Sequence, residues 1–219
     1  MRWKALTFKR ILYIVMEALI LGGFFYLFIA IVDELQENEI VRFDERVIDN
    51  MHAFISPRLT EFMNVITFFG SVKWLVIAVI IASVLLIIVK KISLAFFMMI
   101  SSGVGALFNI LLKLIFKRER PDIMPLIEAQ GFSFPSGHSM GSFIFYGSLA
   151  YIIIHLARSR RWKAAWSLLL SCFIIAIGIS RIYLGVHFPS DVIAGFAAGG
   201  VWLTIMILGF RYYESCKNL

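Results

Sequence analysis

Six long apolar segments, separated by shorter polar stretches, form the main pattern of this chain. They cover residues 11–32, 74–89, 92–116, 139–156, 166–182 and 192–210. A helix needs roughly 17–25 apolar residues to cross a hydrocarbon core of about 30 Å, and each segment approximates that length. The pattern therefore predicts an all-α integral membrane bundle of six transmembrane helices. Because the chain has no linker, repeat or change of composition, we expect residues 1–219 to form a single membrane-embedded domain.

The polar segment between the first two apolar segments, residues 33–72, is rich in acidic side chains. Asp44 is suited to capping a helix that runs to Ile55 before Pro57 breaks it, and residues 59–69 have an apolar face suited to the membrane interface. We therefore expect short interfacial helices in this segment. His52 has no partner at a useful spacing, so we interpret it as solvated or packed and not catalytic.

Composition supports a membrane protein, with 60% hydrophobic residues, 16% charged residues and a mean hydropathy of +0.87. Soluble domains have about 45–50% apolar and about 25% charged residues. The net charge of +7 does not indicate nucleic-acid binding, because Lys and Arg cluster at the ends of apolar segments, where topology and anionic lipid explain them. The first apolar segment is longer than the core of a signal peptide, so we interpret it as a retained span. Cys172 and Cys216 imply no disulfide framework.

The distribution of basic residues predicts the orientation in the cell membrane. Twelve of the 21 Lys and Arg residues fall on one side of a six-span arrangement, which the positive-inside rule makes cytoplasmic, together with both termini. The opposite side holds the acidic segment. Glu17, the only charge in the first apolar segment, is expected to make a helix-packing contact near the cytoplasmic end. The twelve residues are Arg2, Lys4, Lys9, Arg10, Lys90, Lys91, Arg158, Arg160, Arg161, Lys163, Arg211 and Lys217.

Three blocks of polar residues on the predicted extracytoplasmic side carry the candidate chemistry. They are Lys113 with Arg120-Pro121, Pro135-Ser136-Gly137-His138, and Ser180-Arg181 with His187 and Asp191. Complete and in this order, the blocks resemble the motif set of the type 2 phosphatidic acid phosphatase superfamily, the integral-membrane lipid phosphatases related to vanadium haloperoxidases and acid phosphatases. This resemblance implies an active site on the extracytoplasmic side that binds a lipid phosphate within the bilayer.

The basic residues of these blocks suit phosphoryl transfer. Lys113 and Arg120 are seven residues apart, so both face one way if the helix continues up to Pro121, whose ring would end it. Together with Arg181 they supply three cations for the charged oxygens of a transferring phosphoryl group. Lys113 lies within an apolar segment, where a charge indicates function by default.

The remaining residues of the blocks suit anion binding and covalent catalysis. Ser136 and Gly137 precede a predicted helix, so backbone N–H groups and the Ser136 hydroxyl are placed to bind phosphate. A carboxylate such as Asp191 fixes the tautomer of a nucleophilic histidine and stabilises its phosphorylated form, so we expect His187 to be the nucleophile. His138 is then left to protonate the leaving oxygen and to activate water.

Acidic residues beside the first block raise the alternative of metal catalysis. Glu119, Asp122 and Glu128 could hold ions against phosphate oxygens, but the three cations already supply positive charge, so we expect a metal-independent reaction without a cofactor. Lys117 and Arg118 are interpreted as helix-end residues that extend toward the membrane surface.

The resemblance implies hydrolysis of a terminal lipid phosphate through a phosphohistidine at the outer leaflet. The short chain looks like the bacterial phosphatidylglycerophosphate phosphatase B type of the superfamily, which favours phosphatidylglycerol phosphate or undecaprenyl pyrophosphate as substrate. Phosphatidic acid and diacylglycerol pyrophosphate remain open. So do two other classes, a lipid phosphotransferase and a non-catalytic lipid-binding or transport protein, although the latter would not require the His187–Asp191 pair.

Overall fold

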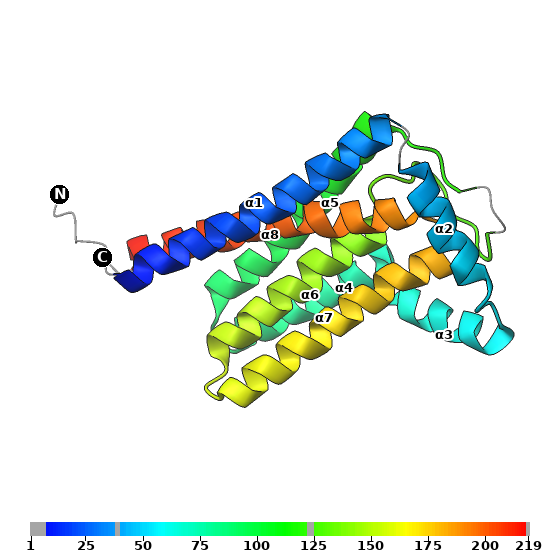
Figure 1. The fold of residues 1–219 in the computed structure, drawn as a ribbon. Coiled ribbons are helices and arrows are strands. Elements are labelled where there is room, and N and C mark those ends of the chain that lie inside the picture. The colour runs from blue at the N-terminus through cyan, green and yellow to red at the C-terminus, as the bar shows by residue number, and fades with distance from the viewer. Residues whose placement is uncertain (1–7, 38–39, 122–124, 218–219) are drawn as a thin grey trace.

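The computed structural model describes residues 8–37, 40–121 and 125–217, and for residues 8–10 the backbone alone. The predictions made for Arg2, Lys4, Asp122 and the side chains of Lys9 and Arg10 therefore lie outside the described residues. Within the described ranges the chain forms helices and no strand, which confirms the all-α prediction (Figure 1). The helices are α1 (Phe8–Gln36), α2 (Val41–His52), α3 (Pro57–Phe68), α4 (Val72–Ile88), α5 (Ile92–Phe116), α6 (Gly137–Leu156), α7 (Arg160–Tyr183) and α8 (Pro189–Lys217).

Six of these helices correspond to the six predicted apolar segments. Helices α1, α5, α6, α7 and α8 are each long and apolar enough to cross a membrane. Helix α4 has 17 residues and supplies the sixth span when it is counted together with α3, from which it is bent by 47°. The protein is therefore a multi-pass membrane bundle, as the hydrophobic pattern predicts.

The polar segment after α1 forms two short helices whose bounds differ from those predicted. Helix α2 ends at His52 and not at Ile55, and Asp44 lies in its first turn as a buried residue rather than capping its start. Pro57 is the first residue of α3, a position that tolerates proline because the missing N–H has no partner inside the helix. The predicted cap at Asp44 was thus wrong, and the side chain has other partners.

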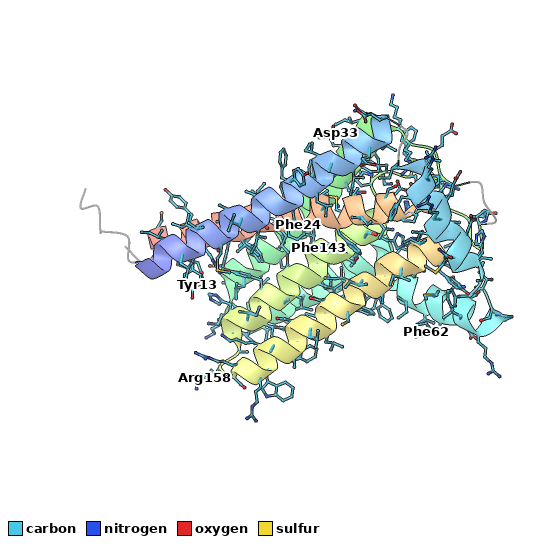
Figure 2. The ribbon with its side chains drawn as sticks, in the orientation of Figure 1. Tyr13, Phe24, Asp33, Phe62, Phe143 and Arg158 are labelled. Atoms are coloured by element: carbon cyan, nitrogen blue, oxygen red, sulfur yellow. The ribbon has the colours of Figure 1, made fainter. Side chains whose placement is uncertain are left out.

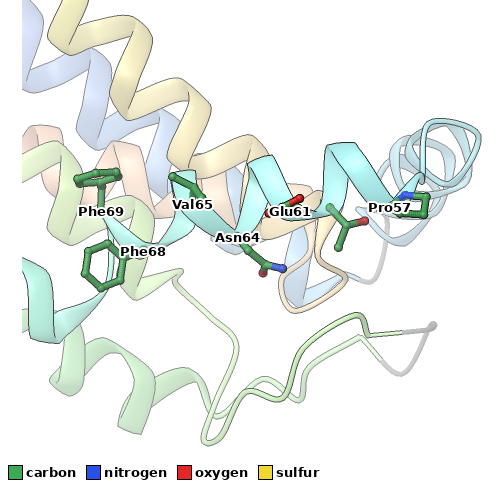
Figure 3. A pocket seen from close by; sticks show the side chains of 7 residues that line it. Pro57, Glu61, Asn64, Val65, Phe68 and Phe69 are labelled. Atoms are coloured by element: carbon green, nitrogen blue, oxygen red, sulfur yellow. The ribbon is translucent and has the colours of Figure 1, made fainter.

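Helix α3 has one exposed face that mixes polar and apolar side chains. Figure 3 shows Glu61 and Asn64 on this face beside Val65 and Phe68, where they line a groove of about 560 Å³. Thr60 also lines the groove, and its hydroxyl oxygen lies 3.0 Å from the Tyr183 hydroxyl, a contact that ties α3 to the end of α7. A helix with such a mixed face suits the boundary between lipid and water.

Close approach of α6 and α8 sets the position of the site. A Cβ at Gly195 would lie 2.8 Å from the carbonyl oxygen of Ser136, and one at Gly199 would lie 3.1 Å from the Cβ of Phe143. Glycine at these two positions therefore lets the backbones pack directly, as small residues four apart commonly do in membrane helices. Helix α1 is more peripheral and packs its Phe24 edge-to-face on Phe143, as Figure 2 shows near the middle of the bundle.

The two ends of the bundle carry different structures. Helices α2 and α3, the α5–α6 segment and the α7–α8 turn lie together at one end, which we call the catalytic end (Figure 1). The beginning of α1, the end of α8 and the α6–α7 turn lie at the opposite end, which we call the distal end. Arg158 marks the distal end and Phe62 the catalytic end in Figure 2.

Candidate active site

All three motif blocks meet at the catalytic end, but one of them does so differently from the prediction. Helix α5 stops at Phe116, where Lys117 takes the left-handed conformation (φ 47°), so the expected helix up to Pro121 is wrong. Lys113 lies in the last turn of α5, whereas Arg120 reaches the site from the following loop. A left-handed residue directly after the last helical residue, as at Lys117, ends a helix and redirects the chain.

His187 lies at the centre of the site, in the short turn between α7 and α8, and only 2% of it is exposed. Its Nδ1 is 3.4 Å from Oδ2 of Asp191 and 3.2 Å from Oγ of Ser133. Its Nε2 is 3.2 Å from Nη1 of Arg120. One ring nitrogen thus faces a carboxylate and the other faces a cation, an arrangement that selects the tautomer with the proton on Nδ1.

The surroundings of His187 keep its imidazole neutral. Burial, which removes hydration from the charged form, is the main cause that lowers the pKa of His187 from 6.5 to about 4, and the positive charges of Arg120 and Arg181 act in the same direction. The hydrogen bond and charge of Asp191 act in the opposite direction but are outweighed. A neutral imidazole retains the lone pair that a nucleophile needs.

Lys113 and Arg120 hold the loop that precedes α6. The Lys113 ammonium donates to the Phe132 carbonyl at 2.6 Å, and Arg120 donates through Nε to the Gly131 carbonyl at 2.9 Å. Arg120 also donates through Nη1 to the Val186 carbonyl at 2.7 Å. The two cations therefore bring the α5–α6 loop and the α7–α8 turn together around His187.

Arg181 carries an open hydrogen-bond position inside the site. It is 4% exposed, and its Nη1 donates to the Thr67 hydroxyl of α3 at 2.6 Å. Its buried Nε has no partner among the described residues. A buried N–H of a charged group is costly without an acceptor, and an anion supplies one.

Ser136, Gly137 and His138 form the beginning of α6. Ser136 caps the helix through Oγ, which accepts from Ser139 N at 3.4 Å, and its own N–H donates to the Asp191 carbonyl at 3.0 Å. The Ser136 N–H is therefore occupied by a protein acceptor and is not free for phosphate. The Ser136 hydroxyl only accepts in its contact with Ser139, so its own proton is still available to donate. A Cβ at Gly137 would lie 3.8 Å from Lys113 Cε. His138 packs against the α3–α4 bend, where a Cβ at Gly70 would lie 3.2 Å from its Cδ2.

Sequence reasoning missed three residues that contact the predicted site and a fourth, Asp44, that contacts one of those three. Thr67 binds Arg181, and Ser133 donates a short hydrogen bond to Asp191. Arg118 pairs with Asp191 and with Asp44, so the interpretation of Arg118 as a residue that extends to the membrane surface was wrong. The only available signal was the position of Arg118 and Ser133 in the chain beside motif residues.

Several other polar residues outside the three motif blocks lie away from His187. Glu119 and Glu128 are exposed, and no group of three His, Cys, Asp or Glu side chains converges as a metal site within the part of the chain that the structure describes. His155 lies at the distal end beside Glu214. Glu17 pairs with Arg211, which confirms the predicted contact between helices, and both cysteines are free, in agreement with the absence of a disulfide framework.

This combination of helical bundle and polar site is the one that a known membrane-enzyme family carries. The model of the PAP2 superfamily matches residues 90–214, which contain all three blocks. The chain belongs to the PAP2 superfamily, and the prediction of a membrane lipid phosphatase is confirmed at that level.

Particular members of the family resemble the chain over most of its length. Phosphatidylglycerophosphatase B of Bacillus subtilis (strain 168) is 32% identical over 187 residues, which cover 85% of this chain and 92% of the relative. A crystal structure of the transmembrane PAP2 type phosphatidylglycerolphosphate phosphatase from Bacillus subtilis superposes with a TM-score of 0.82, at 31% identity, over 88% of this chain and 96% of the other. Undecaprenyl-diphosphatase BcrC of the same organism is 31% identical over 115 residues, 50% of this chain and 51% of the relative.

Proposed function

We propose that this protein hydrolyses the terminal phosphate of a lipid phosphate or pyrophosphate, with His187 as the nucleophile. The observation that carries the proposal is the buried His187–Asp191 pair, 3.4 Å apart, together with three cations from three different segments. Lys113, Arg120 and Arg181 supply fixed positive charge where phosphoryl oxygens would lie, and such prearranged charge is the usual means of stabilising phosphoryl transfer.

In the first step the lone pair of His187 Nε2 attacks phosphorus while the bond from phosphorus to the lipid oxygen breaks. His138 gives a proton to that leaving oxygen, and Asp191 accepts a hydrogen bond from Nδ1–H as the ring becomes cationic. In the second step His138 takes a proton from water, the water oxygen bonds to phosphorus and the phosphorus–nitrogen bond breaks. Inorganic phosphate leaves and His187 returns to its neutral form.

An apolar groove supports a lipid as the substrate. The groove has a volume of about 320 Å³, lies among α4, α5 and α6, and includes Asn109 and Gly137 in its lining. Gly137 begins α6 beside Lys113 and directly before His138, so an acyl or prenyl chain in the groove has its phosphate end next to the site. Half of the lining residues are branched aliphatic or aromatic, namely Val72, Leu75, Val76, Val79, Ile80, Ile110, Ile144 and Phe145.

Phosphatidylglycerol phosphate and undecaprenyl pyrophosphate are the substrates that we favour, because relatives bearing those activities in their names match the chain. Phosphate release from detergent-solubilised protein in excess chelator is the test, with these two lipids and phosphatidic acid as substrates. Release from at least one lipid, and inhibition by vanadate, are expected. Activity that required magnesium would contradict the metal-independent mechanism, and phosphate that appeared only on an added alcohol would favour a phosphotransferase.

We propose further that the catalytic end faces outward and both termini face the cytoplasm. The distal end carries Lys90, Lys91 and the basic cluster around the α6–α7 turn, and basic loops stay on the cytoplasmic side. A cysteine at exposed Glu128, in a chain with Cys172 and Cys216 replaced by serine, should react with a membrane-impermeant thiol reagent in whole cells. Labelling only after the membrane is broken would reverse the orientation.

A further inference from the structure

A buried ion network joins the catalytic carboxylate to the acidic segment after α1. Arg118 lies between two carboxylates, with Nη1 2.7 Å from Oδ1 of Asp191 and Nη2 2.8 Å from Oδ2 of Asp44. Asp44 belongs to α2 and is 74 residues away from Arg118 in sequence. The two aspartates are 0% and 1% exposed. The network therefore connects α2, the α5–α6 loop and the start of α8.

Ser190 and Phe188 complete the surroundings of Arg118. Asp44 accepts from Ser190 N at 2.9 Å and from Ser190 Oγ at 2.6 Å, so both of its oxygens are occupied. Arg118 also donates to Ser190 Oγ at 2.7 Å, and its guanidinium lies 4.0 Å from the centre of the Phe188 ring. These contacts fix the guanidinium plane, because two carboxylates bound by different nitrogens and a ring face each restrict its orientation.

The division of the Asp191 oxygens shows what this network does at the site. Oδ1 is taken by Arg118, whereas Oδ2 faces His187, the Ser133 hydroxyl and the Phe188 N–H at 2.9 Å. Arg118 thus holds one oxygen so that the other points at the imidazole. Rotation of the carboxylate would break contacts on both sides.

The network contains one positive and two negative charges, which affects how strongly Asp191 stabilises a cationic imidazole. An arginine paired with Asp191 alone would neutralise it and weaken its attraction for a cationic imidazole. The second carboxylate, Asp44, shares the same guanidinium, so the group of three retains a net negative charge beside His187. A buried charged network is a weak source of stability, since desolvation of the ions offsets their attraction, and a role in function accounts better for its presence.

We propose that Asp44 and Arg118 are positioning residues for phosphoryl transfer, which act through Asp191 on His187. Arg118 fixes the carboxylate, and Asp44 fixes Arg118 and offsets its charge. The inference rests on the proposed function of His187 as nucleophile. This role also explains why the acidic segment after α1 folds against the site, because its helix α2 positions Asp44 beside Arg118.

Asp44→Asn is the direct test, since it removes one charge with little change of shape. At metal sites, loss of a residue that orients a ligating side chain typically costs about 10–100-fold in activity. We expect kcat to fall by a similar factor here while KM stays within about twofold, because Lys113, Arg120 and Arg181 still hold the phosphate. Phosphoenzyme formation from a nitrophenyl phosphate should slow by the same factor. Asp49→Asn is the matched control on the exposed side of α2 and should leave both constants unchanged.

A double-variant comparison separates positioning from simple folding support. Arg118→Gln leaves Asp44 and Asp191 without their shared cation, so its kcat should fall further than that of Asp44→Asn. Adding Asp44→Asn to Arg118→Gln removes one of the two negative charges and should restore part of kcat. A network that served folding alone would leave kcat per folded protein unchanged in all three variants.

Each activity is divided by the concentration of folded protein. That concentration is measured on the monodisperse fraction, and thermal unfolding shows how much of the fraction is folded. Wild-type kcat in folded Asp44→Asn, or losses that follow the folded fraction alone, would overturn the positioning role. An additive loss in the double variant would do the same. Failure of the wild-type protein to form phosphohistidine would instead overturn the proposed function, so the two failures are distinguishable.

Discussion

The catalytic and distal ends of the bundle contain the same kinds of charged residue in opposite environments. At the catalytic end Asp44, Arg181, His187 and Asp191 are each less than 5% exposed. At the distal end His155 and its partner Glu214 are 39% and 33% exposed, and Arg211 is 46% exposed in its pair with Glu17. Both ends thus have ion pairs that join different helices, but only one end removes them from solvent.

Under the proposed function, this difference in exposure separates residues that orient the protein from residues that act on a substrate. An exposed ion pair contributes little to the free energy of unfolding, with a median of about 0–1 kcal/mol, because its charges remain hydrated. A buried charge is expensive unless it is paired and hydrogen-bonded, and Asp191 has four such partners in Arg118, Ser133, His187 and Phe188. Substitutions at the two ends should therefore differ greatly in their effect on activity.

The largest effect is expected from His187→Ala. Without the imidazole no covalent intermediate forms, and loss of a nucleophile costs on the order of 10⁴-fold or more in kcat. Phosphate release from the preferred lipid, measured on folded protein, checks the prediction. Residual activity within about tenfold of wild type would mean that another group attacks phosphorus.

His138→Ala should have a smaller and substrate-dependent effect. General acid–base catalysis contributes typically 10²–10⁴-fold, so turnover of a lipid phosphate should fall by about that amount. A nitrophenyl phosphate needs less help from an acid, so the variant should still form phosphoenzyme from it. Equal losses in phosphoenzyme formation for both substrates would argue against proton transfer as the role of His138.

Acid tolerance should follow from the buried position of His187. A pKa of about 4 leaves about nine-tenths of the imidazole neutral at pH 5, compared with about 3% for the ordinary value of 6.5, a difference of roughly thirtyfold. Activity should therefore decline only as the pH falls through about 4, where the ring becomes protonated. The measurement is the rate of phosphoenzyme formation against pH, divided by the separately determined ionisation of the substrate. A half-maximal rate near pH 6.5 would contradict the account.

Thr67→Val should weaken substrate binding moderately. The change removes the hydroxyl that accepts a hydrogen bond from Arg181, and a hydrogen bond to a charged group is worth about 1.5 kcal/mol at the lower end of its range, or roughly tenfold in KM. Thr60→Val is a matched control on the same helix, because its hydroxyl contacts Tyr183 and not a site cation. Steady-state kinetics on the two variants distinguish a role in substrate binding from a role in helix packing. Equal changes in KM for both variants would contradict a role of Thr67 in substrate binding.

The smallest effect is expected at the distal end. His155→Ala removes an exposed contact with Glu214, and Arg211→Ala removes the exposed partner of Glu17, both far from the candidate active site, so kcat and KM should each stay within about twofold of wild type. The same assay of phosphate release applies. A loss of tenfold or more from either variant would show that the distal end is coupled to the site.

The motif residues of the catalytic end could be predicted from sequence because they lie near helix ends. The hydrophobic pattern places those ends on one side of the membrane, so Lys113, His138 and Asp191 were expected to meet before any packing was known. The path of Arg120 was not predictable in this way. Helix α5 ends at Phe116 without a glycine or proline, and the left-handed turn at Lys117 depends on the loop that Arg120 itself holds.

The support of the site was less predictable than the site itself. The contact between Asp44 and Arg118 requires α2 to fold back over the start of α8, and no periodicity in residues 33–72 encodes that placement. Thr67 likewise becomes important because α3 packs against the end of α7. Local patterns specify which residues are polar, whereas the long-range packing decides which of these polar groups share a buried space.

The central claim, that His187 carries the phosphoryl group, is tested most directly by locating that group in the protein. His138→Ala should accumulate phosphoenzyme when it is supplied with a nitrophenyl phosphate, because hydrolysis of the intermediate is slowed. Mass spectrometry of peptides prepared under alkaline conditions, where phosphohistidine survives, should then place the phosphoryl group on His187. Its presence on another residue, or its persistence when His187→Ala is added, would contradict the account.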